Sequence, residues 1–332
     1  MKALIYSDVH ISQDSSIVKS FGTKYSTRLE YIIKSLNWVE RLADERGCDA
    51  VFNLGDTFDK PYINAMEATA VQDVKWSALP HYVLVGNHDS DVASLEYSSV
   101  SILKKFGFDI ITRPTTINGI GLLPYCLEKD RKPLDETFKE LPKIIFSHND
   151  IAGINFGHFI SKEGYKVGDI ESHCDLFLNG HLHNTTWVTK KILNVGNLCG
   201  QNFSEDGFTY KHGCWVLDTD TLEIGFVENP FALNFYKLEY PENKKFIVSN
   251  TDNTNKVITV RVERKDVQTV KDLIGNNPSI IASRVVVYDK DVGKGEEVKL
   301  EKIDHLKTFV EFVKEKLGNS ELVNNELAEV CK

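Results

Sequence analysis

Five short segments of the chain carry side chains that bind divalent metal ions, and each directly follows an apolar run. Carboxylate, imidazole and amide groups in one set suit ions of intermediate hardness, such as Mn²⁺, Fe²⁺ or Zn²⁺, better than a structural zinc. The five segments are Ser7-Asp8-Val9-His10, Gly55-Asp56-Thr57-Phe58-Asp59, Gly86-Asn87-His88-Asp89, Ser147-His148-Asn149-Asp150 and Gly180-His181-Leu182-His183. Together they predict a centre that holds two divalent ions.

The apolar runs before these segments predict the strands that must position them. They are short and rich in β-branched and aromatic residues, which is typical of buried strands. Open α/β sheets place their chemistry just beyond the carboxyl ends of the strands. We therefore expect all five segments to emerge from one edge of a sheet. The runs are residues 3–6, 50–54, 82–85, 144–146 and 176–178.

Helices and further strands are predicted between these runs. Thr27-x-x-Glu30 forms a capping box that would open a helix ending near Gly47, with an apolar face from Leu29 to Leu42. Because this helix joins the first two strands, a right-handed parallel β-α-β crossover is expected. The other predicted elements are helices over 64–78 and 94–106 and strands over 143–146, 175–178, 192–195 and 214–217.

The length of 332 residues and a break at Asn229-Pro230 favour more than one domain. We divide the chain into residues 1–235, 236–302 and 303–332. The middle part predicts a small α+β unit, from strands over 256–264 and 283–288 and a helix over 266–275. The last part predicts a helix over 303–317, whose apolar residues recur at helical spacing before Gly318.

Composition is that of an ordinary soluble globular protein, with 42% hydrophobic and 26% charged residues. Six scattered cysteines without a Cys-x-x-Cys pair favour reduced thiols in a cytosolic setting. Neither a signal peptide, a membrane-spanning run nor an ATP-binding P-loop is expected. The net charge of −9 arises wholly within residues 1–235 and opposes a nucleic-acid role. Two bound dications would offset part of it locally.

The five segments are more specific together than apart, because Asp-x-His pairs and Gly-Asp-x-x-Asp turns are each common by chance. In this order, each behind an apolar run, they make the sequence resemble the calcineurin-like metallophosphoesterase superfamily. Within it, the chain resembles the SbcD-type (meiotic-recombination-type) DNA-repair nucleases and is similar to phage recombination endonuclease subunits. The resemblance implies an α/β fold, a β-sandwich flanked by helices, with a small α+β C-terminal capping domain.

The resemblance also implies a role for each site residue. One ion would be held by Asp8, His10, Asp56 and His183, and the other by Asp56, Asn87, His148 and His181, with Asp56 bridging. The implied ions are two Mn²⁺, with Mg²⁺ as the alternative. His88 would protonate the leaving oxygen, and Asp59 would accept its other ring N–H and raise its pKa. Some relatives carry histidine in place of Asp59. The remaining histidines fit no ligand pattern: His81, His158, His173, His212 and His305.

The implied activity is that of a DNA nuclease, a 3′-to-5′ exonuclease on duplex ends and an endonuclease on single strands. It would act in DNA recombination, repair and replication as a homodimer, beside an SbcC-type, SMC-like ATPase, in the cytoplasm of a bacterium or a phage-infected host. Residues 236–302 would bind DNA, and 303–332 would contact the ATPase or pack on the capping domain. Ser/Thr phosphatases of the superfamily carry phosphate-clamping arginines where this chain has Lys60 and Val85, which argues against a protein phosphatase.

Two other functions stay open at this point. A small-molecule or cyclic-nucleotide phosphodiesterase would use the same fold and the same ions on another substrate. A non-catalytic scaffold would keep the fold alone, and the intact ligand set and His88 argue against it.

Overall fold

The computed structural model describes residues 1–14, 24–91, 94–154, 160–250 and 254–289. Residues 1–288 cluster as one compact unit. The predicted helix over 303–317, the rest of 303–332 and the histidines at positions 158 and 305 lie outside the described residues. Within the described part of the chain, no helix has the length and apolarity needed to cross a membrane.

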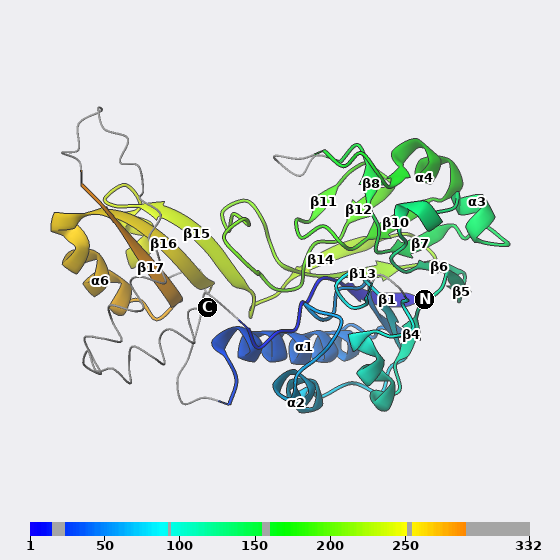
Figure 1. Cartoon of the computed structure of the whole chain (residues 1–332), viewed down its shortest axis with the longest axis horizontal. Helices are drawn as coiled ribbons and strands as arrows, with labels where there is room; N and C mark the ends of the chain where they lie inside the picture. The colour runs from blue at the N-terminus through cyan, green and yellow to red at the C-terminus, as the bar shows by residue number, and fades with distance from the viewer. Residues whose placement is uncertain (15–23, 92–93, 155–159, 251–253, 290–332) are drawn as a thin grey trace, which may run out of the picture. The chain divides into compact units, whose positions relative to one another are not determined.

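Two six-stranded sheets form the body of the protein (Figure 1). The first has the order β14-β13-β1-β2-β3-β4 and the second β11-β12-β10-β7-β6-β5. The first sheet comprises β1 (Lys2–Tyr6), β2 (Ala50–Asn53), β3 (His81–Leu84), β4 (Asp109–Ile111), β13 (Gly213–Asp218) and β14 (Ile224–Glu228). The second comprises β5 (Thr115–Ile117), β6 (Ile120–Leu123), β7 (Ile144–Ser147), β10 (Leu176–Asn179), β11 (Thr186–Trp187) and β12 (Ile192–Asn194). A separate pair joins β8 (Ile151–Ala152) to β9 (Tyr165–Lys166).

Strand side chains alternate between two cores, because successive residues of a strand point to opposite faces. In β1, Ala3 and Ile5 belong to the cluster between the two sheets, whereas Leu4 and Tyr6 belong to the cluster on the outer face. In β7, Phe146 faces inward and Ile145 outward. Both faces of each sheet are therefore buried, which explains why these strands are continuous apolar runs.

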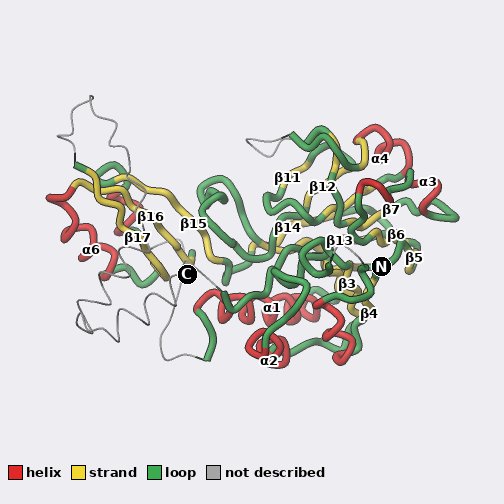
Figure 2. The backbone as a smooth tube through the Cα atoms, in the orientation of Figure 1, coloured by secondary structure: helices red, strands yellow, loops and turns green. Residues whose placement is uncertain are grey.

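Helices cover the two outer faces, as the tube view shows (Figure 2). The first sheet is covered by α1 (Thr27–Glu45), α2 (Ala65–Asp73) and the 3₁₀ helix η1 (Ser99–Phe106), and the second by α3 (Leu134–Thr137) and α4 (Val167–His173). The short 3₁₀ helix η2 (Glu128–Asp130) has no buried residue. The apolar face predicted for the first helix, including Leu29 and Leu36, packs on the first sheet. The predicted α/β sandwich flanked by helices is thus confirmed.

Three local predictions need correction. The five segments do not share one sheet, because the first three follow β1, β2 and β3 and the last two follow β7 and β10 of the other sheet. The helix predicted over 94–106 is the shorter 3₁₀ helix η1, whose first residue Ser99 is bonded to the Asp89 carbonyl oxygen. The N-cap of α1 is Ser26 and not Thr27, because Ser26 has extended backbone and its Oγ accepts the Leu29 N–H at 3.3 Å.

The C-terminal part of the described chain forms a third, wholly parallel sheet, β15-β16-β17. Its apolar cluster includes Ile258 and Val260 of the central strand and Val270 of α6. The elements are β15 (Leu233–Glu239), α5 (Lys244–Val248), β16 (Asn255–Glu263), η3 (Arg264–Asp266), α6 (Val267–Gly275) and β17 (Ile280–Tyr288). The strand–helix–strand order agrees with the α+β unit expected here. The boundaries at 235 and 302 stay predictions, and β15 crosses the first of them.

The cap of α1 offers a direct stability test. Ser26→Ala removes the side-chain acceptor of an otherwise unpaired helix N–H and should lower the free energy of unfolding by about 1 kcal/mol. Ser26→Asp is the matched control, because its side chain keeps an acceptor at the N-cap, and it should cost a few tenths of a kcal/mol at most. Urea unfolding of both variants measures the difference, and equal losses would contradict the assignment of the cap.

Candidate metal centre

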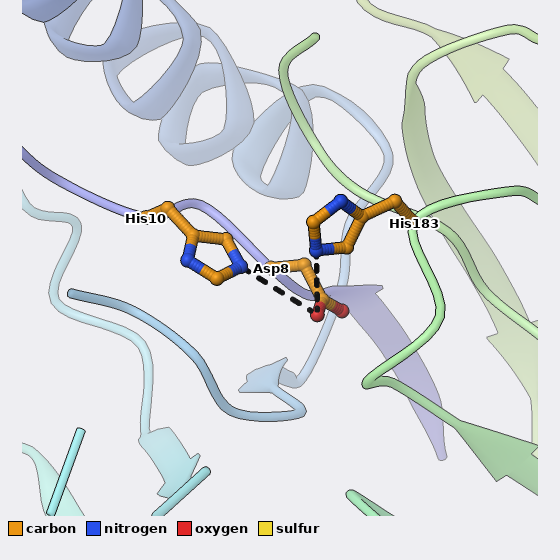
Figure 3. A group of neighbouring side chains, drawn as sticks. All are labelled: Asp8, His10 and His183. Atoms are coloured by element: carbon orange, nitrogen blue, oxygen red, sulfur yellow. Dashed lines mark ion pairs between the residues drawn. The ribbon is translucent and has the colours of Figure 1, made fainter. Parts of the chain in front are cut away.

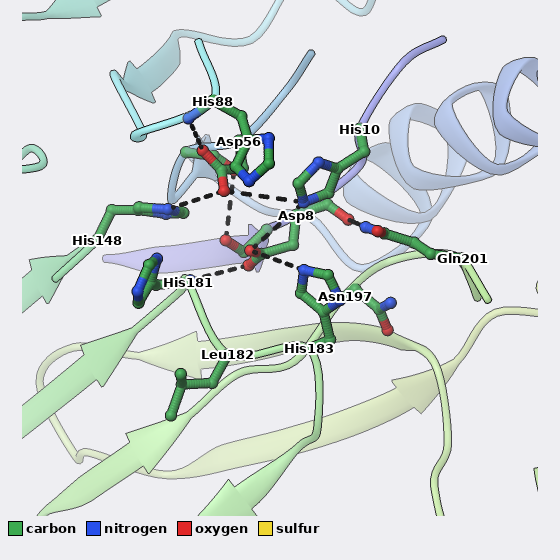
Figure 4. A network of polar contacts seen from close by, with 12 residues as sticks. Asp8, His10, Asp56, His88, His148, His181, Leu182, His183, Asn197 and Gln201 are labelled. Carbon is green, nitrogen blue, oxygen red and sulfur yellow. Dashed lines mark hydrogen bonds and ion pairs between the residues drawn. The ribbon is translucent and has the colours of Figure 1, made fainter. Parts of the chain in front are cut away.

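The carboxyl ends of five central strands meet at one end of the sandwich and carry every predicted ligand (Figure 4). Asp8 and His10 follow β1, Asp56 follows β2, and Asn87 follows β3. From the second sheet, His148 follows β7, and His181 and His183 follow β10. Several contacts join the sheets here, including two through main-chain atoms. His148 Nδ1 lies 2.6 Å from the Leu54 carbonyl oxygen, and the His181 N–H donates to Asp8 Oδ2 at 3.1 Å.

The ligand-type atoms form two neighbouring clusters. In the first, Asp8 Oδ1 lies 3.9 Å from His10 Nε2 and 4.0 Å from His183 Nε2 (Figure 3). In the second, Asn87 Oδ1 lies 3.2 Å from His148 Nε2 and 2.9 Å from His181 Nδ1. Such spacing between neighbouring donors leaves room for one ion in each cluster.

Asp56 lies between the clusters, as the bridging role requires. Its Oδ2 is 3.7 Å from His10 Nε2 in the first cluster and 3.2 Å from His148 Nε2 in the second. Its Oδ1 accepts the His88 N–H at 2.9 Å, which fixes the orientation of the carboxylate. A carboxylate in this position screens the repulsion between two dications.

Buried polar atoms without hydrogen-bond partners show that the site is suited to a pair of metal ions. Asp8, His10, Asp56 and His148 are at most 1% exposed, yet Asp8 Oδ1 and His10 Nε2 make no hydrogen bond. A buried polar atom without a partner costs free energy. A bound cation would satisfy both atoms and neutralise the buried carboxylates, so the site is suited to hold divalent ions.

The backbone of the site is strained at its ligands. Asp8, His10, Asp56 and His181 adopt positive φ angles of 52°, 48°, 50° and 74°. Non-glycine residues rarely occupy this region, and each such residue costs about 1–2 kcal/mol. In the described residues only Asn118 and Leu222 share this conformation among non-glycine positions. The fold therefore gives up some stability to aim these side chains inward.

A glycine lets two of the strand-end loops approach each other. A Cβ atom at Gly86 would lie 2.2 Å from Asp56 Oδ1 and 2.4 Å from the Asp56 backbone nitrogen. No other residue type fits there without displacing the bridging carboxylate. The Asp89 carboxylate accepts the Phe58 N–H across the same two loops and the Gly86 N–H within its own loop, each at 2.9 Å. Burial and the charge of Asp56 raise the pKa of Asp89 to about 7.

Each ligand histidine has an outer partner on its second ring nitrogen, as metal-binding histidines usually do. His10 Nδ1 lies 3.4 Å from Asp59 Oδ1, and His183 Nδ1 lies 3.6 Å from Glu205 Oε1. His181 is reversed, because its Nε2 faces Asp150 Oδ1 at 3.2 Å and its Nδ1 faces the centre. The metal-facing atoms are therefore Nε2 in His10, His148 and His183, and Nδ1 in His181.

The electrostatics of the second cluster favour a charged pair. Burial lowers the pKa of His148, but the charge of Asp56 and the hydrogen bond to it outweigh burial and raise that pKa to about 9. Burial raises the pKa of Asp56, yet His148 and His10 hold it below its usual range. Without metal, His148 is thus a cation beside Asp56. A metal ion would replace that proton as the counter-charge.

The structure places His88 on the open side of the site but corrects the role of Asp59. His88 is exposed, and its ring lies edge-on to His10 with centroids 4.8 Å apart. Its Nδ1 contacts the main-chain carbonyl oxygen of Asp59 at 3.1 Å, whereas the Asp59 carboxylate faces His10. A carbonyl oxygen can only accept, so His88 Nδ1 carries a proton and Nε2 is the atom that exchanges one. Phe58, which precedes Asp59, pairs with Ile11 in an isolated bridge, and the Asp59 N–H donates to the Ile11 carbonyl oxygen at 3.3 Å, so Asp59 lies beside the segment that carries His10.

Sequence reasoning missed the support behind the ligands. Glu205 is 4% exposed and accepts from Asn197 Nδ2 at 3.0 Å and from the Gln201 N–H at 2.9 Å. His212, which matched no ligand pattern, lies behind it, with Nδ1 2.5 Å from Asn197 Oδ1. Asp150 belongs to the fourth of the five segments, residues 147–150. Only the placement of Asp150 beside His181 and of Glu205 beside His183 shows what they do.

The bridging position of Asp56 makes a prediction about metal content. Asp56→Asn weakens the binding of both ions, because a neutral amide replaces a carboxylate that faces both clusters, whereas Asp8→Asn affects the first cluster alone. We expect Asp56→Asn to retain less metal than Asp8→Asn after dialysis. Elemental analysis of the two purified variants measures this. Equal residual metal in both would refute the bridging role.

Comparison with known proteins gives the chain a family. No curated protein matches it. Similar solved structures include a novel archaeal phosphodiesterase (13% identity, 69% of this chain and 99% of that chain, TM-score 0.35). They also include TT1561 of Thermus thermophilus (12%, 68% and 98%, TM-score 0.42) and the Pseudomonas putida nuclease MPE (15%, 60% and 78%, TM-score 0.27). The model of the calcineurin-like phosphoesterase family matches residues 1–185. Because this match covers more than half of the 332 residues, the protein belongs to the calcineurin-like phosphoesterase family and is a metal-dependent phosphoester hydrolase.

Proposed function

We propose that the protein is a two-metal-dependent DNA nuclease of the SbcD type. The observation that carries the proposal is the gathering of Asp8, His10 and His183 in one cluster and of Asp56, His148 and His181 in the other, with the exposed His88 beside His10 and Asp56. The bound ions would activate a water and polarise the phosphoryl oxygens. Mn²⁺ is the proposed ion, with Mg²⁺ as the alternative, because the donors mix imidazole nitrogen with carboxylate and amide oxygen.

The chain's own groups would supply the remaining steps. Asp56 and Asp8 hold negative charge in place for the ions, and Asn87 adds an oxygen donor without adding charge. His88 Nδ1–H donates a hydrogen bond to the Asp59 carbonyl oxygen, so its Nε2 can carry a second proton to the leaving oxygen.

Substrate class is argued from what surrounds the centre. Lys60 is paired with Asp14 at 3.0 Å, and Val85 is fully buried in the apolar core, so neither position offers a phosphate-clamping arginine. This disfavours a phosphomonoesterase such as a protein phosphatase. The separate parallel sheet β15-β16-β17 with α6 supports a capping domain that would hold DNA. The 3′-to-5′ exonuclease and single-strand endonuclease activities, and the role in recombination and repair, belong to the same proposal.

A small-molecule or cyclic-nucleotide phosphodiesterase is the second candidate, and the net charge of −9 favours it. Incubating the pure chain with labelled duplex and single-stranded DNA, in Mn²⁺, Mg²⁺ or EDTA, tests the nuclease directly. Hydrolysis of bis-p-nitrophenyl phosphate in the same conditions reports the metal centre alone. Cleavage of that compound without cleavage of either DNA would favour the second candidate, and cleavage of neither substrate would favour a scaffold.

His88→Ala should separate chemistry from metal binding. The variant should keep both ions, because His88 contributes to the open side, and lose about 10²–10⁴-fold in phosphodiester cleavage. Asp59→Ala is the informative partner, because it keeps the carbonyl that contacts His88 and removes the carboxylate that faces His10. Asp59→Ala should therefore lower the affinity for metal. Elemental analysis beside cleavage rates measures both, and a His88→Ala protein without metal would disprove the acid role.

We also propose a homodimer and an SMC-like ATPase partner that contacts residues 303–332. Deleting 303–332 should spare Mn²⁺-dependent cleavage of short single strands and abolish ATP-stimulated digestion of duplex ends in the presence of the ATPase. Light scattering of the full and shortened chains gives the oligomeric state, for which the protomer mass is 37.6 kDa. A shortened chain that aggregates would instead assign the segment to the capping domain, and a monomeric mass would contradict the dimer.

A further inference from the structure

A cavity of about 540 Å³ opens beside the second metal cluster. Asn87, whose Oδ1 contacts both His148 and His181, forms part of its wall. Tyr125 forms another part, and its ring centroid lies 6.2 Å from that of His181. The cavity and the second metal cluster therefore share a wall. A group bound in the cavity would lie next to a phosphoryl group held at the ions.

The lining of the cavity suits a flat, weakly polar group. Tyr125, Leu95, Leu127 and Tyr165 supply aromatic and aliphatic surface, and the Glu136 carboxylate supplies an acceptor. Aromatic rings bind flat heterocycles by stacking, and a few polar groups then fix their orientation.

The wall is held in place before any ligand arrives. The Arg131 guanidinium lies 5.3 Å from the centre of the Tyr165 ring, and its Nη2 donates to the Cys126 carbonyl oxygen at 3.2 Å. The Tyr125 N–H donates to the Val85 carbonyl oxygen at 2.9 Å. Arg131 also lies 4.0 Å from Asp150, the partner of His181, so the wall and the metal centre share one network. A rigid wall lowers the entropic cost of binding.

We propose that this cavity binds one unpaired nucleobase, that of the nucleotide attached to the scissile phosphate. The inference rests on the proposed function, since it takes the substrate to be a nucleic acid. A cavity of this volume holds a ligand the size of one nucleoside. It has no room for a base pair with its stacked neighbours, because that is several times the size of one nucleoside. The base must therefore leave its stack, which single strands and frayed ends allow most readily.

Calorimetric titration of the metal-loaded full chain tests the cavity without any cleavage. A deoxynucleoside 5′-monophosphate should bind roughly tenfold more tightly than deoxyribose 5-phosphate, which has the same sugar and phosphate but no base. Tyr125→Ala, or Leu95→Trp as an independent variant that fills the cavity, should remove most of this difference. Tyr125→Phe keeps the ring and should preserve it. Trp187→Ala, at an aromatic residue that is 44% exposed on β11, is the control outside the cavity and should also preserve it.

Equal affinity for the two phosphates, or a difference that survives both Tyr125→Ala and Leu95→Trp, would overturn the proposal. Cleavage of single-stranded DNA that carries one abasic nucleotide tests the base-binding cavity separately from the nuclease activity. A roughly tenfold rise in KM at the abasic position supports both. Efficient cleavage with no effect of the missing base rejects the cavity and leaves the nuclease standing. A roughly tenfold preference for the nucleotide without any cleavage of DNA supports the cavity and rejects the nuclease.

Discussion

Asp8 and Asp56 place two carboxylates, 0% and 1% exposed, at the same end of the β-sandwich. Burying one anion is costly, and burying two next to each other is costlier still unless cations accompany them. The surrounding histidines offset part of this charge, and His148 takes a proton when no metal is present. Divalent ions would neutralise this negative charge more completely. The arrangement of the strand ends, the outer partners of the histidines and the placement of His88 all follow from holding this charge.

The same requirement explains where the backbone departs from its usual conformations. Four ligand residues have positive φ, and Gly86 makes room for Asp56 where any side chain would collide with it. Regular strands end before these residues, so the irregular loops carry the strain while the sheets remain intact. Two apolar cores, one between the sheets and one under α1 and α2, supply the rigidity that keeps those loops in position.

The cavity and the metal centre form one continuous surface for a substrate. Asn87 belongs to both, and Asp150 connects His181 with the arginine behind the cavity wall. Specificity and chemistry can thus be coupled over one network of side chains.

Local sequence patterns predicted the five candidate metal-binding segments and the strands before them, and the family resemblance carried by those segments implied the α/β sandwich. A buried strand can be predicted from a short apolar run, and the polar segment at its end can be predicted from the few residues that follow. Long-range packing decided the rest. The segments come from two sheets, the carboxylate of Asp59 faces His10 and not His88, and Glu205 and Asp150 stand behind His183 and His181. The cavity, too, closes only where residues from 87 to 165 come together. Such contacts join positions tens to hundreds of residues apart, and the distance between their side chains depends on how whole layers pack, which no local pattern records.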